Sequence, residues 1–332
     1  MRKLFIALVF FLAIGLVIFS FSELENIAAT LQKSNLLFVL AALAVELLWL
    51  LNVALTYRSF YRLLGLDEGL GHLALVVAAV NFVNVVAPTA GMGGMALFVD
   101  NGRKRGHSPG RVTAAGALFL FFDYLAFLAV LALGLVVLFR RNNLDAGEIT
   151  ASLVIVSIAS ALGILLYTGS RSASRLGDVL ARLARRVNRI VRPFIKRDYL
   201  DESRAHAFAC EIGEGLAGLR ADPRRLLWPM LFSLANKALL LGILLLVFLA
   251  FGVPFSAGTV IAGFAIGYLF LIVSPTPNGV GVVEGVLALA LKSLRVEWSQ
   301  AVVVTLVYRA ITFWFQLAVG AVAFRLLNRR RI

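Results

Sequence analysis

Residues 274–285 read SPTPNGVGVVEG, and this stretch interrupts a long apolar run with two prolines, three glycines and a glutamate. At membrane depth, such a break is tolerated only where protein buries it or where it lines a cavity. A similar break, PTAGMGG at 88–94, follows an earlier apolar run. Paired breaks in two halves of a chain are typical of a transporter's binding site.

The composition indicates an all-α polytopic membrane protein. Of the 332 residues, 61% are hydrophobic and 15% are charged, and the mean hydropathy is +0.91. No soluble core could bury that much apolar surface. The net charge of +14 lies mostly in loops beside hydrophobic spans, so we expect no nucleic-acid partner. The single cysteine, Cys210, excludes an intrachain disulfide, and the three histidines are scattered, so no metal or cofactor is expected.

The apolar runs predict about six full crossings and two re-entrant half-helix hairpins. The crossings are expected at 4–21, 36–56, 112–139, 149–168, 228–251 and 301–327. The runs 73–86 and 259–273 are shorter than the roughly 20 residues that a crossing needs, and a proline follows each. We expect one membrane domain, 1–332, with re-entrant repeats at about 73–139 and 259–327 and a basic helical cytoplasmic segment at 171–227.

The charges favour this topology. It places 25 of the 32 Lys and Arg residues in the cytoplasm, five outside and two in the membrane, as the positive-inside bias predicts. Full crossings in place of the hairpins would move the basic cluster at 103–111 outside. Both termini are then cytoplasmic, in an inner (cell) membrane, and the hairpins enter from opposite sides. Such inverted repeats place a shared site near the midplane.

The two breaks supply candidate headgroup-binding residues. A half-helix that starts near Gly281 would point its N–H groups at an anion. Thr276 and Asn278 can add hydrogen bonds, and Glu284, in the first helical turn, either acts on the ligand or only caps a packed kink. The candidates in the second break are Pro275, Thr276, Pro277, Asn278, Gly279, Gly281 and Glu284. Those in the first break are Pro88, Thr89, Gly91, Gly93 and Gly94.

Four further charges lie within apolar spans, where a charge is costly enough to suggest a function. We expect Arg309 either to bind a phosphate, whose oxygens match its guanidinium, or to pair with Glu284, Glu46 or Asp123. Lys237 can instead reach the cytoplasmic surface. Glu46 and Asp123 are either proton sites or partners of these cations. The tryptophans, Trp49 among them, are interpreted as ordinary bundle or interface residues.

The motif PTPNGVGVVE at 275–284 resembles the PTPGGxGxxE signature of the lysylphosphatidylglycerol synthase transmembrane family, also called the flippase-like domain family. Arg309 matches an arginine often found in the helix after that motif, and the resemblance covers essentially the whole chain. Asn278 stands where the family usually has glycine, and the first break lacks the charged residues that usually follow its proline. The aminoacyltransferase domain of the fused synthases has no counterpart in these residues, so we do not expect aminoacyl transfer.

The resemblance implies movement of a lipid between leaflets, with phospholipids, hopanoids or polyprenyl-linked sugars as the candidate lipids. We therefore expect a bacterial or archaeal lipid flippase or transporter. We expect no enzyme, since the chain has no HExxH, no Walker lysine and no GxSxG with a downstream histidine. The alternatives are an integral membrane transferase or accessory subunit in lipid or glycan synthesis, and a scaffold that recruits partners through its basic segment. A homodimer and association with lipid-synthesis enzymes both stay open.

Overall fold

The computed structural model describes residues 34–86, 92–141, 146–172, 223–274 and 276–329, with short pieces between 174 and 212. The predicted first crossing, the tip of the first hairpin, most of the basic segment and Pro275 lie outside the described residues.

Every regular element in the described part of the chain is a helix, which confirms an all-α polytopic membrane protein. Five segments of it are long and apolar enough to cross a membrane. They contain α2 (Leu36–Leu63), α5 (Pro109–Arg140), α6 (Ala146–Arg171), α9 (Leu227–Ala250, after the short turn η1, Pro223–Leu226) and the continuous run Trp298–Arg329. This last helix consists of α12 (Trp298–Arg309), a π-helical turn η3 (Ala310–Phe315) and α13 (Gln316–Arg329).

Two pairs of short helices are inserted between the long ones. The pair α3 (Leu70–Val86) and α4 (Met92–Lys104) precedes α5, and the pair α10 (Ala257–Val273) and α11 (Val282–Ser293) precedes α12. The longest of them have 17 residues. At about 1.5 Å per residue they extend about 26 Å, less than the roughly 30 Å of a bilayer core. The short apolar runs therefore form the predicted short helices.

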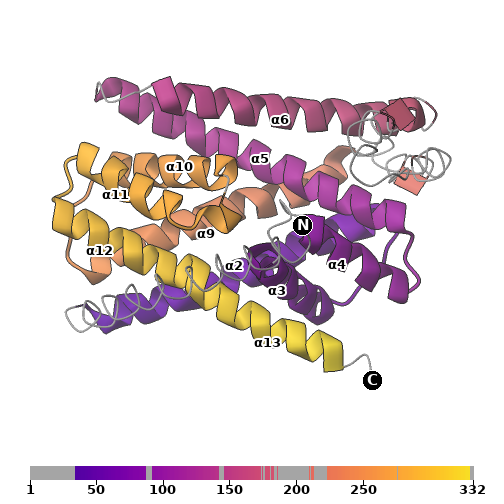
Figure 1. The fold of residues 1–332 in the computed structure, drawn as a ribbon, viewed down its shortest axis with the longest axis horizontal. Coiled ribbons are helices and arrows are strands. Elements are labelled where there is room, and N and C mark those ends of the chain that lie inside the picture. Colours follow the sequence, from indigo (N-terminus) through magenta and orange to yellow (C-terminus); the bar gives the residue numbers. More distant parts are fainter. Residues whose placement is uncertain are drawn as a thin grey trace, which may run out of the picture.

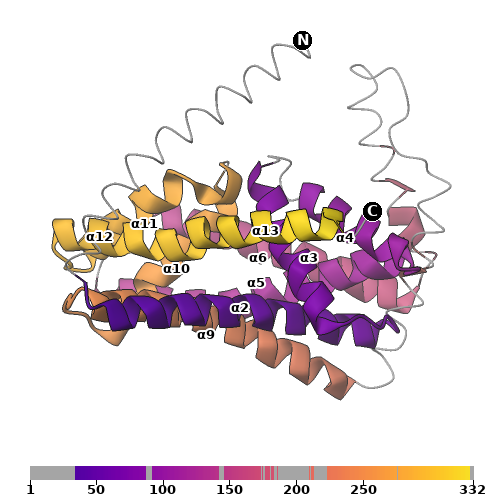
Figure 2. The ribbon, with the colours of Figure 1, turned by 90° about the horizontal axis from the view of Figure 1, so that it is seen from below.

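The two pairs return to opposite ends of the bundle. Figure 1 shows α3 and α4 near one end and α10 and α11 near the other, and Figure 2 shows the same separation. Glu68, just before α3, forms a 2.6 Å ion pair with Arg105, just after α4. At the other end, Arg141 donates to Ser256 before α10 (2.8 Å) and to the carbonyl of Leu294 after α11 (3.2 Å). Each pair is thus a hairpin, and the hairpins enter from opposite ends.

Helix contacts repeat between the two halves of the chain. The helix α2 packs on α9, while α3 packs along α13 and α10 along α5. Each hairpin thus lies against the long helix that follows the other hairpin. Small residues permit both crossings, because a Cβ at Gly320 would lie 2.6 Å from the carbonyl oxygen of Ala78, and one at Gly134 would lie 2.5 Å from Ala265. This arrangement is the one expected of inverted repeats.

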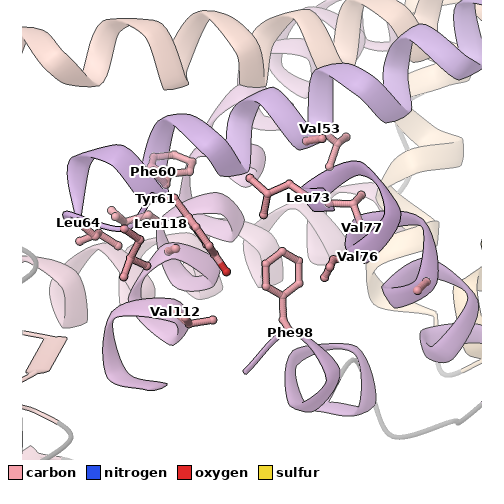
Figure 3. Packing of buried hydrophobic residues seen from close by; sticks show 14 of the residues in the cluster. Val53, Phe60, Tyr61, Leu64, Leu73, Val76, Val77, Phe98, Val112 and Leu118 are labelled. Atoms are coloured by element: carbon pink, nitrogen blue, oxygen red, sulfur yellow. The ribbon is translucent and has the colours of Figure 1, made fainter. Parts of the chain in front are cut away.

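An apolar core fixes the first hairpin against α2 (Figure 3). Phe60 and Tyr61 of α2, Leu73 and Val76 of α3, and Phe98 of α4 pack together, and each is at most 3% exposed. Because these side chains come from three helices, the hairpin cannot shift without opening this core.

We expect Lys104→Cys and Lys292→Cys, in a Cys210→Ser background, to react with a membrane-impermeant maleimide from opposite sides of the membrane. Both side chains are exposed, and they lie at the open ends of the two hairpins. The charge distribution predicts that position 104 faces the cytoplasm. Labelling of both positions from one side would show that the hairpins do not enter from opposite faces.

Candidate functional site

The tip of the second hairpin turns through left-handed backbone. The φ angle is 52° at Asn278, 72° at Gly279 and 80° at Gly281. Glycine adopts this conformation freely, and asparagine is among the few other residues that tolerate it. Asn278 can therefore stand where the PTPGGxGxxE signature has glycine, because the turn requires a left-handed backbone and leaves room for this side chain.

Thr276 and Pro277 shape this tip. The Thr276 hydroxyl donates to the carbonyl of Val280 (2.9 Å) and lies 2.8 Å from Oγ of Ser274. Pro277 begins a single 3-10 turn, η2 (Pro277–Gly279). The hydroxyl of Thr276 is thus used within the turn, and Asn278 is the polar residue of the tip that lines the cavity described below.

Glu284 caps the half-helix and also pairs with a cation. The helix α11 begins at Val282, as the position of Gly281 predicted. Oε2 of Glu284 accepts from the N–H of Gly281 (2.7 Å), which completes a helix cap. Oε1 accepts from Nε of Arg309 at 2.7 Å, and the two side chains are only 12% and 5% exposed. One carboxylate therefore fixes both the start of α11 and the position of Arg309.

Arg309 connects the last long helix to the hairpin tip. Its Nη2 donates to the carbonyl oxygen of Asn278 (3.0 Å), and its guanidinium lies 4.9 Å from the centre of the Phe313 ring. The helix becomes π-helical immediately after Arg309, a distortion that recurs at functional sites. Among the described residues, Nη1 has no hydrogen-bond partner. Of the three carboxylates considered, Arg309 pairs with Glu284.

A cavity of about 170 Å³ lies between the two hairpins and the long helices. Its polar wall comes from α3, η2 and the last long helix, and includes Asn81, Asn84, Asn278, Arg309, Thr312 and Gln316. Trp49, Tyr268 and Tyr308 add aromatic surface. Both hairpins thus contribute to one cavity. Two buried donors of these residues, Nδ2 of Asn81 and Nε1 of Trp49, have no partner among the described residues.

Lys237 is buried in a second charged cluster, so the expectation that it reaches the cytoplasmic surface is wrong. Its Nζ lies 2.7 Å from Oδ1 of Asp123 and 2.5 Å from the hydroxyl oxygen of Tyr268, and the side chain is 1% exposed. The Tyr268 hydroxyl donates to Oδ2 of Asp123 (3.2 Å). Because α9 packs on α5, the Asp123 carboxylate compensates the charge of the Lys237 ammonium inside the bundle. Tyr268 also lines the cavity, which places the cluster next to its wall.

Glu46 is the third carboxylate predicted as a site residue, and it differs from Asp123 and Glu284. Its Oε1 accepts from the side-chain amide of Gln316, a neutral group. The residue is 1% exposed, and none of the described Lys, Arg or His residues forms an ion pair with it. Asp123 is therefore the partner of a cation, and Glu46 is not.

The remaining predicted residues lie at the first break. Pro88, Thr89 and Gly91 are outside the described residues, as is Pro275. Gly93 and Gly94 lie in the first turn of α4. The N–H of Gly94 donates to Oδ1 of Asn84 (3.0 Å), and a Cβ at Gly94 would overlap that side chain. Gly94 therefore serves the closure of the hairpin, while its partner Asn84 lines the cavity.

Comparison with known proteins agrees with this architecture. The family model described as "Lysylphosphatidylglycerol synthase TM region" matches residues 4–320. The chain belongs to this family. It is also similar to a UPF0104 membrane protein of Methanothermobacter thermautotrophicus, with 24% identity over 325 residues that cover 94% of this chain and 91% of that protein. The resemblance inferred from residues 275–284 and Arg309 is thus confirmed.

Several cavity residues of this member of the lysylphosphatidylglycerol synthase TM family were not predicted. Trp49, interpreted as an ordinary bundle residue, lines the cavity, as do Asn81, Asn84 and Gln316. A signal existed for the two asparagines, because they are three residues apart in the apolar second half of a helix and so share one face. No comparable signal marked Trp49, since tryptophan is common in membrane proteins for other reasons.

Arg309→Met is expected to destabilise the protein by about 3–5 kcal/mol, because it leaves Glu284 as a buried charge without its cation. The double variant Glu284→Gln/Arg309→Met should recover part of this loss. Unfolding of the purified proteins in detergent micelles measures both effects. A double variant whose loss equals the sum of the two single losses would contradict a coupled pair.

Proposed function

We propose that this protein moves a polar-headed lipid between the leaflets of a bacterial or archaeal inner membrane. The observation that carries the proposal is the shared cavity, since hairpins from opposite ends of the bundle line the same polar space. Inverted hairpins around a central site suit alternating access, in which the site opens to each side in turn. Membership of the family supports a lipid-related role in the membrane.

The cavity wall suits a headgroup that is rich in hydrogen-bond acceptors. Nδ2 of Asn81 and Nε1 of Trp49 are buried donors without partners among the described residues. An unpaired buried donor costs about 1–3 kcal/mol. Both residues line the cavity, so a rearrangement of their side chains would let phosphate and carbonyl oxygens of a lipid headgroup accept from these donors. A bound headgroup would therefore provide hydrogen-bond acceptors for donors that have no partner among the described residues.

The charges near the cavity favour an anionic or zwitterionic headgroup. Arg309 is balanced by Glu284, but its Nη1 stays available, and a guanidinium suits phosphate oxygens. We assign phosphate binding to Arg309, and we assign to Glu284 the task of holding that guanidinium in place. A phospholipid, a hopanoid or a polyprenyl-linked lipid is the proposed cargo.

The charge distribution also supports the proposed orientation, with both termini in the cytoplasm. The protein would act without a cofactor, as a homodimer or together with enzymes of lipid synthesis. Movement of the lipid would be downhill, coupled to an ion, or driven by a partner.

Asn81→Leu is expected to slow lipid movement about tenfold, because it removes a donor and fills part of the cavity, and a tenfold change corresponds to about 1.4 kcal/mol. The measurement is quenching of a fluorescent phosphatidylglycerol in proteoliposomes by an impermeant reductant. Val80→Leu is the matched control. It places leucine at the adjacent position of the same helix, and position 80 does not line the cavity.

Equal rates in these two variants would contradict a role for the cavity. A new covalent lipid product, formed by the purified wild-type protein from the same vesicles, would favour the transferase alternative instead.

A further inference from the structure

Glu46 is a carboxyl group in the interior of the bundle whose second oxygen is left without a partner. It lies within the long helix α2, and it is 1% exposed. Oε1 accepts from Nε2 of Gln316, while the buried Oε2 has no hydrogen-bond partner.

The two buried cations on neighbouring helices, Lys237 and Arg309, pair with other carboxylates. Lys237 of α9 lies 2.7 Å from Asp123 of α5, and Arg309 at the end of α12 lies 2.7 Å from Glu284. Within the described residues, no Lys, Arg or His therefore compensates a negative charge on Glu46.

The other titratable groups on the elements packed against α2 are uncharged or distant. Tyr308 of α12 interacts electrostatically with Glu46, but a tyrosine is neutral at physiological pH. Tyr124 of α5 is neutral for the same reason. On α3 the titratable group is His72, which bonds to Asn101 near the open end of the first hairpin.

A carboxylate in this position would be a buried charge, and within the described part of the chain one amide would be its only compensation. Burial of an unpaired charge is so costly that such a group takes up a proton instead. Gln316 tolerates both forms, because its amide can donate to a carboxylate or, turned over, accept from the O–H of a carboxylic acid. The surroundings thus indicate that Glu46 carries a proton in this conformation.

The other half of the bundle provides an internal comparison. Glu46 lies as many residues after the start of α2 as Lys237 lies after the start of α9, and these two helices pack on each other. Each of these helices contacts the long helix after one of the hairpins. Lys237 forms an ion pair with Asp123 of α5, and Glu46 accepts a hydrogen bond from Gln316 of α13. Among the described residues, the two halves thus place an ion pair and an acid without a counter-ion at corresponding positions.

Glu46 is connected to the cavity through its neighbours. Gln316 lines the cavity, and so does Trp49, which lies one helical turn after Glu46. Water or a headgroup that enters the cavity therefore comes within one side chain of the carboxyl group. Water entering from an open side would stabilise the carboxylate and allow the proton to leave.

We propose that Glu46 is a proton-binding site that couples lipid movement to the transmembrane proton gradient. The carboxylate takes a proton from water on one side of the membrane, holds it while the cavity is closed, and returns it to water on the other side. This coupling rests on the proposed lipid transport, whereas proton binding by Glu46 does not.

Infrared spectroscopy of the purified protein in detergent tests the proton binding without any transport. At neutral pH, the wild-type protein should show a carboxylic-acid C=O band that Glu46→Gln removes and that Glu46→Asp shifts. Glu297→Gln is the matched control, because it makes the same chemical change at an exposed helix cap and should leave the band in place. Unchanged melting of Glu46→Gln would show that the variant folds. A band that persists in that folded variant would overturn the proposal.

Proteoliposomes test the coupling. With a gradient of one pH unit, a tenfold ratio of proton concentrations, a transporter that moves one proton per lipid should accumulate labelled phosphatidylglycerol in one leaflet by up to about tenfold. Glu46→Gln should lose this accumulation, and Glu297→Gln should retain it. Wild-type movement that ignores the gradient would contradict the coupling alone. Absence of any wild-type movement would contradict the proposed transport, while the infrared band would still decide whether Glu46 binds a proton.

Discussion

The ion pair between Glu284 and Arg309 is the interaction on which the central site depends. A chain that stops and turns at membrane depth exposes N–H and carbonyl groups that no lipid can satisfy. Glu284 accepts from the N–H of Gly281, the residue that precedes α11, and Arg309 donates to the carbonyl of Asn278 in the turn itself. The 2.7 Å contact between the two side chains neutralises both charges and fixes the hairpin tip to the last long helix. The cavity can then have a polar wall in an apolar bundle, because its most costly groups are already paired.

The overall architecture could be predicted from the sequence because its causes are local. The lengths of apolar runs separate crossings from hairpins, and the observed α3 (Leu70–Val86) and α10 (Ala257–Val273) differ from the predicted 73–86 and 259–273 only at their starts. The distribution of basic residues distinguished hairpins from full crossings, since those alternatives place a whole charged cluster on different sides. The turn chemistry near Gly281 likewise predicted where α11 begins.

The partners of the buried charges could not be predicted in the same way. The sequence offered three carboxylates as partners of Arg309, namely Glu284, Glu46 and Asp123. Which of them pairs with it depends on where helices distant in the sequence cross. The crossing of α9 on α5 buries Lys237 against Asp123, although its position in the span allowed it to reach water. Trp49 and Gln316 acquire their place in the cavity from the same crossings. Composition and spacing describe each helix alone, whereas these contacts belong to pairs of helices.

The helices of the two halves are arranged alike, but the buried side chains at corresponding positions differ. If both halves carried an ion pair at these positions, neither half would contain a buried acid without a counter-ion. Here Lys237 and Asp123 form an ion pair, while Glu46 accepts a hydrogen bond from the neutral amide of Gln316. Water that enters the cavity would change the free energy of this ion pair less, because each ion already has its partner. A carboxylate at Glu46, which has no counter-ion among the described residues, would gain more from that water, because its free energy depends strongly on hydration. In the proposed transport, similar backbones would provide two access routes, and the difference in side chains would make one half sensitive to which route is open.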